Sequence, residues 1–158
     1  MRQGDGFTLM ELLIVLTVAG LVLAIGMPAF SSYRNSLALR QARQQLVTDL
    51  RGARQYAITR RAPVIVKFRL APDSTRSYQI HVDSNANGVV NAGERLIRRS
   101  LPSRSTFASV SLTPADSLIY DISGILWPGT SGGTLVFRNQ RDRRDTLAVS
   151  AAGIAYRP

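Results

Sequence analysis

The feature that most constrains this chain is a nearly uninterrupted apolar run close to its N-terminus. Between Phe7 and Phe30 the sequence carries a single ionisable side chain, Glu11. A helix of this length can cross a bilayer, which takes roughly 20 apolar residues. A secretory signal has a shorter apolar core of about 7–15 residues with small residues at a cleavage site, whereas this run continues into a helical pattern. We therefore expect a membrane anchor.

Glu11 is the informative residue of this run, because a carboxylate in hydrocarbon is tolerated only with a partner or a function. No basic residue lies near it in the apolar run. Cleavage after Gly6 would create an α-amino group on Phe7, one helical turn before Glu11, and that group could neutralise the carboxylate. If the amine belongs to a neighbouring copy, the pair would set the axial register of a filament, since removing either member leaves an unpaired charge.

The leader MRQGDG and the following run FTLMELLIVLTVAGLVLAIGMPAF resemble the class III leader and helix of type IV pilins and type II secretion pseudopilins. The resemblance implies that a prepilin peptidase cuts after Gly6 and methylates Phe7, and that Glu11 is needed for assembly. It also implies a kink at Pro28, where an interior proline removes a backbone hydrogen bond and clashes with the preceding turn. The alternative for Pro28 is simply the end of the membrane span.

The expected fold is therefore α+β, a pilin fold in which a long N-terminal helix packs on a mostly antiparallel β head. We expect a leader at residues 1–6, a transmembrane and filament-core helix at 7–30, and a head at 31–158. Within the head, an amphipathic helix is expected at 31–60 and β structure at 62–158. The chain would cross the inner membrane once with its head in the periplasm, and then enter a pilus or pseudopilus.

The segment from Ser31 to Thr59 has no proline, one glycine and apolar residues at helical spacing. This apolar stripe, expected to lie on a sheet, consists of Leu39, Ala42, Leu46, Leu50, Ala53 and Ala57. At about 100° per residue, a basic ridge falls beside it, formed by Arg40, Arg43, Arg51, Arg54 and Arg61. The ridge is a solvated helix face or a contact for acidic neighbours in a filament, or it binds nucleic acid or lipid.

Beyond Arg61 the apolar pattern changes to a period of two, which predicts strands separated by turn residues. The expected strands are 64–70, 78–82, 95–97, 106–112, 117–120, 133–138, 145–150 and 154–157. Residues 139–144 are expected to form the tip of a hairpin that joins two of the later strands.

Residues 83–94 fit the calcium-loop template D-x-[DN]-x-[DN]-G-x5-E at every specified position. Calcium ligands would come from Asp83, Asn85, Asn87, the Val89 carbonyl, Asn91 through a water, and a bidentate Glu94. With two charged ligands the site would be weak, and its flanks read as strands where an EF-hand has helices. The alternative is a long hairpin turn in which Asn and Asp side chains cap their own backbone and the glycines supply positive φ.

Catalytic chemistry has little support in this sequence. It has no cysteine, which excludes disulfides, zinc–thiolate clusters and thiol nucleophiles. His81 is the single histidine and is expected to be a half-exposed strand residue without a metal or catalytic role. No serine triad, phosphate loop or close carboxylate pair is evident, so we do not expect an enzyme.

The pattern of turn residues in the head, including Gly124–Gly129 and the segment 149–157, resembles that of the GspH/FimT group of minor pilins and pseudopilins. The resemblance implies a place near the tip of the fibre. It also implies, for FimT-like members, DNA binding through a C-terminal G-R-x-R motif. Here the matching segment reads Gly153-Ile-Ala-Tyr-Arg157, so the first arginine is absent and the second is displaced by one position.

The chain has 20 basic and 10 acidic residues, a formal charge of +10 that favours an anionic partner. The hairpin and the last strand could gather a phosphate-binding patch from Arg138, Arg141, Arg143, Arg144 and Arg157. The alternative is an ordinary charged hairpin tip, whose positive charge is partly offset by Asp142 and Asp145. Two functions therefore stand, a structural fibre subunit that assembles with other pilins and a pilus-borne DNA receptor. A third, a plain inner-membrane anchored domain that is never assembled, requires that Gly6 is not processed. A secretion pseudopilus and a retractile pilus use the same leader and helix.

Overall fold

The computed structural model describes residues 8–68 and 75–158. The predicted leader, the predicted cleavage site at Gly6 and Phe7, and the predicted strand end at residues 69–70 lie outside the described residues. The chain divides into two compact units, Met1–Arg34 and Asn35–Pro158.

The first unit contains the apolar part of helix α1, which spans Leu9–Arg60. The helix begins at a cap in which the Thr8 Oγ1 accepts a hydrogen bond of 3.2 Å from the backbone N–H of Glu11. One stretch of 18 residues has a mean hydropathy of 2.5 and none of it is buried, so the helix is long and apolar enough to cross a membrane. α1 continues through position 28, and the kink at Pro28 stays a prediction.

In the second unit, the C-terminal part of α1 buries the predicted apolar stripe. Its members are all less than a tenth exposed, Ala38 extends the stripe toward the N-terminus, and the polar residue Asn35 is buried as well. The basic ridge was wrong at one position. Arg61 follows the last helical residue, Arg60, and has a φ of 50°. A left-handed residue at this point ends the helix, so Arg61 does not continue the ridge.

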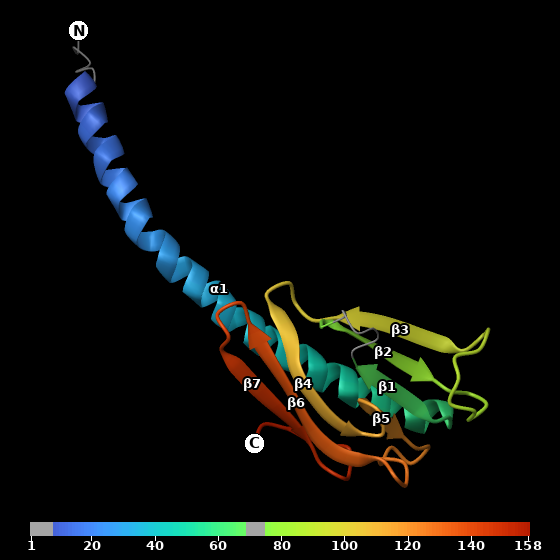
Figure 1. Cartoon of the computed structure of the whole chain (residues 1–158). Helices are drawn as coiled ribbons and strands as arrows, with labels where there is room; N and C mark the ends of the chain where they lie inside the picture. Colours follow the sequence, from blue (N-terminus) through green and yellow to red (C-terminus); the bar gives the residue numbers. More distant parts are fainter. Residues whose placement is uncertain (1–7, 69–74) are drawn as a thin grey trace. The chain divides into compact units, whose positions relative to one another are not determined.

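The strands form two four-stranded antiparallel sheets (Figure 1). The first sheet has the order β3-β2-β1-β5, with β1 at Val64–Phe68, β2 at Ser77–Val82, β3 at Arg95–Ser100 and β5 at Ser117–Tyr120. The second has the order β4-β6-β7-β8, with β4 at Ser105–Thr113, β6 at Ser131–Asn139, β7 at Arg144–Val149 and β8 at Ala155–Tyr156. Each predicted strand is present, with small differences at the ends.

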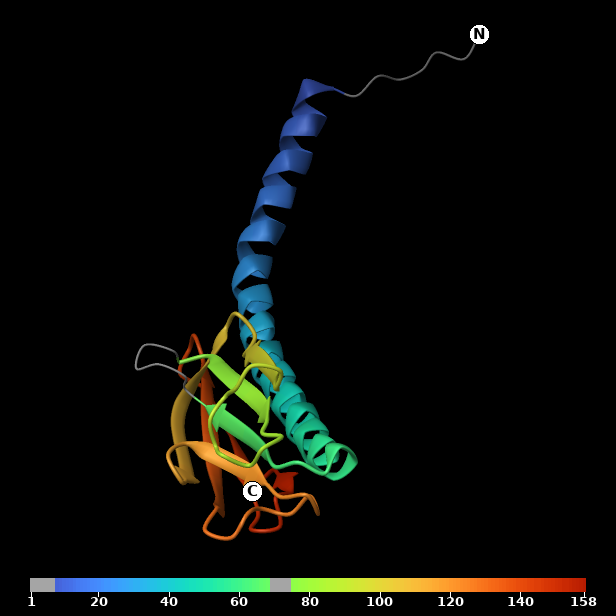
Figure 2. The ribbon, with the colours of Figure 1, turned by 90° about the vertical axis from the view of Figure 1, so that its right-hand side faces the viewer.

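The core of the second unit lies where both sheets meet the apolar stripe of α1, and Figures 1 and 2 show the strands beside that part of the helix. Three buried rings join the sheets, because Phe68 and Tyr78 of the first sheet meet Phe107 of β4 with ring centroids 5.7–6.3 Å apart. Such aromatic contacts add to the stability that burial alone provides. The expected α+β architecture, one long helix on antiparallel sheets, is confirmed.

Candidate functional site

The loop that joins β2 to β3 is fastened at its neck by two carboxylates. Asp83 follows β2 directly and accepts backbone hydrogen bonds from Asn87 at 3.1 Å and Gly88 at 2.7 Å. Glu94 precedes β3 and accepts backbone hydrogen bonds from Ser84 at 3.1 Å and from Asn91 at 2.9 Å. The loop thus folds back on itself, and both carboxylates point inward.

The amide side chains of the same loop also cap its backbone. Asn85 and Asn87 accept hydrogen bonds from the backbone N–H two residues ahead, at 3.2 Å and 2.8 Å. The Asn91 amide donates to the Val89 carbonyl at 2.8 Å. Gly88 has a φ of 74°, which glycine adopts at no steric cost. These contacts are those of the self-capped hairpin turn, and calcium binding by the loop stays a prediction.

His81 corrects one expectation from the sequence. The residue is 2% exposed rather than half-exposed. Its Nε2 lies 2.8 Å from Glu94 Oε2. This hydrogen bond, together with the backbone N–H of Asn91, lowers the pKa of Glu94 from 4.5 to about 2. The ligand atoms of His81, Asp83 and Glu94 all lie within 4.8 Å of one another.

A second cluster gathers arginines from three separate segments. It is a cavity of about 460 Å³, here called the arginine pocket, lined by Ser36, Leu39, Arg40, Arg43, Arg143, Arg144, Asp145 and Arg157. The Asp145 carboxylate lies 2.7 Å from Arg43 and 4.0 Å from Arg157. Asp145 is the one acidic residue beside five arginines in this lining, although Arg144 also pairs with Asp142 at 3.3 Å. The pocket therefore has an excess of positive charge suited to an anion.

The arginine pocket contains part of the DNA-binding set predicted from the sequence. Arg143, Arg144 and Arg157 line it, whereas Arg138 lines a different cavity and pairs with Asp142 at 3.2 Å. The hydrogen bond from Arg138 and the nearby charge of Arg144 lower the pKa of Asp142. Arg141 is exposed and lines neither cavity.

Sequence reasoning missed the contribution of the helix to this pocket. Arg40 and Arg43 belong to the predicted basic ridge, but nothing local shows that the hairpin lies beside them. The available signal was Asp145, a lone acid among hairpin arginines that could have been matched to an arginine of the ridge.

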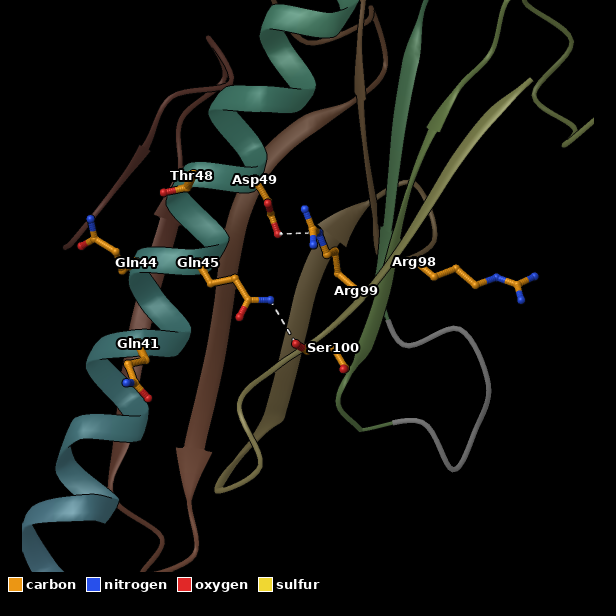
Figure 3. Close-up of a pocket in the computed structure, with 8 residues that line it drawn as sticks. All are labelled: Gln41, Gln44, Gln45, Thr48, Asp49, Arg98, Arg99 and Ser100. Carbon is orange, nitrogen blue, oxygen red and sulfur yellow. Dashed lines mark hydrogen bonds and ion pairs between the residues drawn. The ribbon is translucent and has the colours of Figure 1, made fainter. Parts of the chain in front are cut away.

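A groove of about 690 Å³ separates α1 from the edge strand β3 (Figure 3). Gln45 donates to the Ser100 carbonyl at 3.0 Å, and Asp49 faces Arg99 at 3.8 Å (Figure 3). Tyr78 lies beneath and donates to Asp49, and burial together with this carboxylate raises the pKa of Tyr78. The lining is polar and contains one carboxylate and no histidine, so its groups do not form a nucleophile–base pair.

An N-terminal helix that is apolar in its first part and packs on antiparallel sheets in its second defines a pilin-type protein. Comparisons with known proteins identify the family. The chain belongs to the GspH family, described as type II transport protein GspH, which matches residues 42–153. The prokaryotic N-terminal methylation motif matches residues 1–27.

Individual proteins are similar to the chain in sequence or in fold. The pilin-like protein PilA1 of Thermus thermophilus is 35% identical over 126 residues, which cover 76% of this chain and 78% of the relative. A crystal structure of the type IV minor pilin FimU of Pseudomonas aeruginosa PAO1 matches with a TM-score of 0.58 and 21% identity, over 80% of this chain and 91% of FimU.

A second crystal form of FimU gives a TM-score of 0.55 at 20% identity, over 76% of this chain and 92% of FimU. At these identities the FimU structures show the fold alone. Together with the family match and the methylation motif, they make the chain a minor pilin or pseudopilin with an N-terminal region typical of a membrane-anchored pilin.

Proposed function

We propose that a prepilin peptidase cleaves this chain after Gly6 and methylates Phe7, and that the 7–30 helix holds it in the inner membrane with its head in the periplasm. The processed chain then joins a type II secretion pseudopilus or type IV pilus near its tip, as a structural subunit rather than an enzyme. The observation that carries this proposal is the methylation motif at residues 1–27, which precedes the GspH match at residues 42–153.

Glu11 has a specific role in this proposal. It lies in the first turn of α1 and is the sole acidic residue there. Across residues 8–68 and 75–158, its carboxylate has no ion-pair partner within the chain. An unpaired carboxylate in an apolar segment is expensive, so the amine of a processed N-terminus is the partner we infer.

Assembly is tested by comparing wild type with Glu11→Gln in cells that assemble the fibre. Both proteins should be cleaved and reach the membrane, but the variant should be strongly depleted from sheared fibres because it cannot pair with an amine. Thr17→Val is a matched control, since Thr17 donates to the Leu13 carbonyl inside its own helix. Equal amounts of Glu11→Gln and wild type in the fibres would contradict the assigned role of Glu11.

A second candidate function, DNA capture by the fibre, is favoured by the arginine pocket. Arginines from α1, the β6–β7 hairpin and the C-terminal segment line this pocket, together with the single acidic residue Asp145. Arginine clusters of this kind bind phosphate oxygens without reading sequence. Tyr156 of β8 is half exposed and offers a stacking surface for an unpaired base.

DNA capture is tested by fluorescence anisotropy of labelled DNA with the full chain in nonionic detergent, at several salt concentrations. The double variant Arg143→Glu, Arg144→Glu should bind far more weakly. On duplex DNA its log–log salt slope should fall by about 0.9 for each phosphate that the variant no longer neutralises. Arg98→Glu, on β3 and outside the arginine pocket, is the control. Weak binding that is indifferent to the double substitution would remove this candidate and leave the structural role.

A further inference from the structure

The neck of the β2–β3 loop contains a buried cluster of three potential metal ligands. His81 and Asp83 are each 2% exposed, and the side chain of Glu94 is 6% exposed. They come from the end of β2 and the residue before β3, which the antiparallel pairing of Val82 with Arg95 brings together. The cluster is therefore held in place by the ladder of the first sheet.

The charges of this cluster do not balance. Two carboxylates share the site with one imidazole, and no arginine or lysine in the described part of the chain forms an ion pair with Asp83 or Glu94. Glu94 has the His81 ring as a side-chain partner, whereas Asp83 receives only backbone N–H groups, from Asn87 and Gly88. Buried charges are normally paired or coordinate a metal, so the site is short of positive charge although the whole chain has a formal charge of +10.

We propose that His81, Asp83 and Glu94 bind a divalent transition-metal ion, for which Zn²⁺ is the probe. The donor set of one imidazole nitrogen and two carboxylate oxygens suits such an ion, whereas calcium prefers oxygen ligands alone. This site differs from the predicted calcium loop, in which His81 has no part and Asn85 is a ligand.

The spacing of the donor atoms is compatible with a metal ion that replaces the hydrogen bond between His81 and Glu94. His81 Nε2 and Glu94 Oε2 are 2.8 Å apart. Bonds of about 2.1 Å from one zinc ion to both atoms require a separation of about 3.0–3.4 Å, so the two side chains would move apart slightly. All three ligand atoms lie within 4.8 Å of one another, so those that are farthest apart would have to move closer for all three to contact one ion. The bound ion would fasten the loop to the sheet.

The test uses the untagged full chain in nonionic detergent, stripped of metal with EDTA and then dialysed. Calorimetric titration with Zn²⁺ should show binding at one site, and Zn²⁺ should raise the melting temperature, because an ion that binds only the folded state stabilises it. His81→Gln keeps an N–H donor for Glu94 but loses the ligand, and should weaken Zn²⁺ binding by at least about tenfold. Asn85→Ala is the matched control in the same loop and should bind Zn²⁺ like wild type.

A second measurement needs no substitution and stays valid if His81→Gln fails to fold. The chain contains a single histidine, so the ¹⁵N resonance of its Nε2 reports ligation directly and should shift on addition of Zn²⁺. Absence of Zn²⁺ binding, or binding that leaves this resonance unchanged, would overturn the proposal. Zn²⁺ binding that is lost in Asn85→Ala but kept in His81→Gln would also overturn it, and would instead point to the oxygen ligands of the predicted calcium loop.

Discussion

At Gly153 the chain turns with a φ of 75°, and an added Cβ would lie 2.6 Å from the ring of Tyr120. Tyr120 is fully buried and donates a hydrogen bond of 3.1 Å to the Gly153 carbonyl. The Tyr120 ring cannot move away easily, because it belongs to the core and its hydroxyl is hydrogen-bonded to the Gly153 carbonyl. Position 153 therefore requires glycine for two reasons: the backbone is left-handed there, and the Tyr120 ring occupies the space that a Cβ would need.

Gly153→Ala should lower the free energy of unfolding by about 1–3 kcal/mol more than Gly93→Ala does, through overpacking against Tyr120. Gly93 has a φ of 90° with nothing within 4 Å of an added Cβ, so its substitution measures the backbone cost alone, about 1–2 kcal/mol. Urea unfolding of both variants gives the comparison. Equal losses would show that the ring does not restrict position 153.

The buried tyrosines predict a loss of stability at alkaline pH. Burial raises the pKa of Tyr78, and it raises the pKa of Tyr120 from 10.0 to about 12. Because the folded-state pKa exceeds the unfolded value, the stabilisation is complete below pH 10 and is lost as the pH rises through 12. An absorbance titration should show tyrosines that ionise at a higher pH than the others. The Tyr120→Phe variant should have one fewer of these tyrosines. Ionisation of all five tyrosines together near the ordinary value would contradict this burial.

At the scale of single residues, the sequence predicted positions better than partners. The template over residues 83–94 placed Asp83 and Glu94 on the loop, and both lie at its neck. It did not predict the burial of His81 or its contact with Glu94, which lies 13 positions along the chain and is not encoded in the strand pattern. Likewise Arg43 was assigned to the basic ridge, but its contact with Asp145 spans 102 positions of the chain.

Among the elements, the C-terminal part of α1 depends on its buried stripe. Leu46 is fully buried in the core, whereas Leu37, on the same helix, is 36% exposed. Leu46→Ala should lower the free energy of unfolding by about 2–5 kcal/mol because it leaves a cavity, and Leu37→Ala should change it by about 1 kcal/mol or less. Chemical denaturation measures both. A loss at position 37 as large as at position 46 would mean that the helix does not pack through this stripe.

Element types followed from local patterns, but sheet order did not. The period of 3.6 predicted the helical stripe, and alternation with turn residues predicted each strand. β3 nevertheless continues to Ser100, because its register with β2 pairs Ser100 with Ser77. β5 leaves its sequence neighbour β4 and joins the first sheet, where Val64 pairs with Tyr120. Such pairings depend on contacts between distant segments, which no local period encodes.

For the whole molecule, the two units differ in where their apolar side chains lie. Among the side chains that the structure describes, the core residues lie in the second unit, from Ala38 onward, while the large apolar ones of the first part of α1 are exposed. Large exposed apolar surfaces mark membrane or protein contacts. In detergent phase partition, the full chain should enter the detergent phase and residues 35–158 alone should stay in the aqueous phase. Recovery of the full chain in the aqueous phase would contradict the predicted anchor.

The central claim is that the chain is processed after Gly6 and built into a fibre through its N-terminal helix. The most direct test is mass spectrometry of the N-terminal peptide of this chain in sheared, purified fibres. We predict a peptide that begins at N-methylated Phe7, in the fibres and not only in the membrane. A chain that retains Met1–Gly6, or that stays in the membrane while fibres form without it, would contradict this claim.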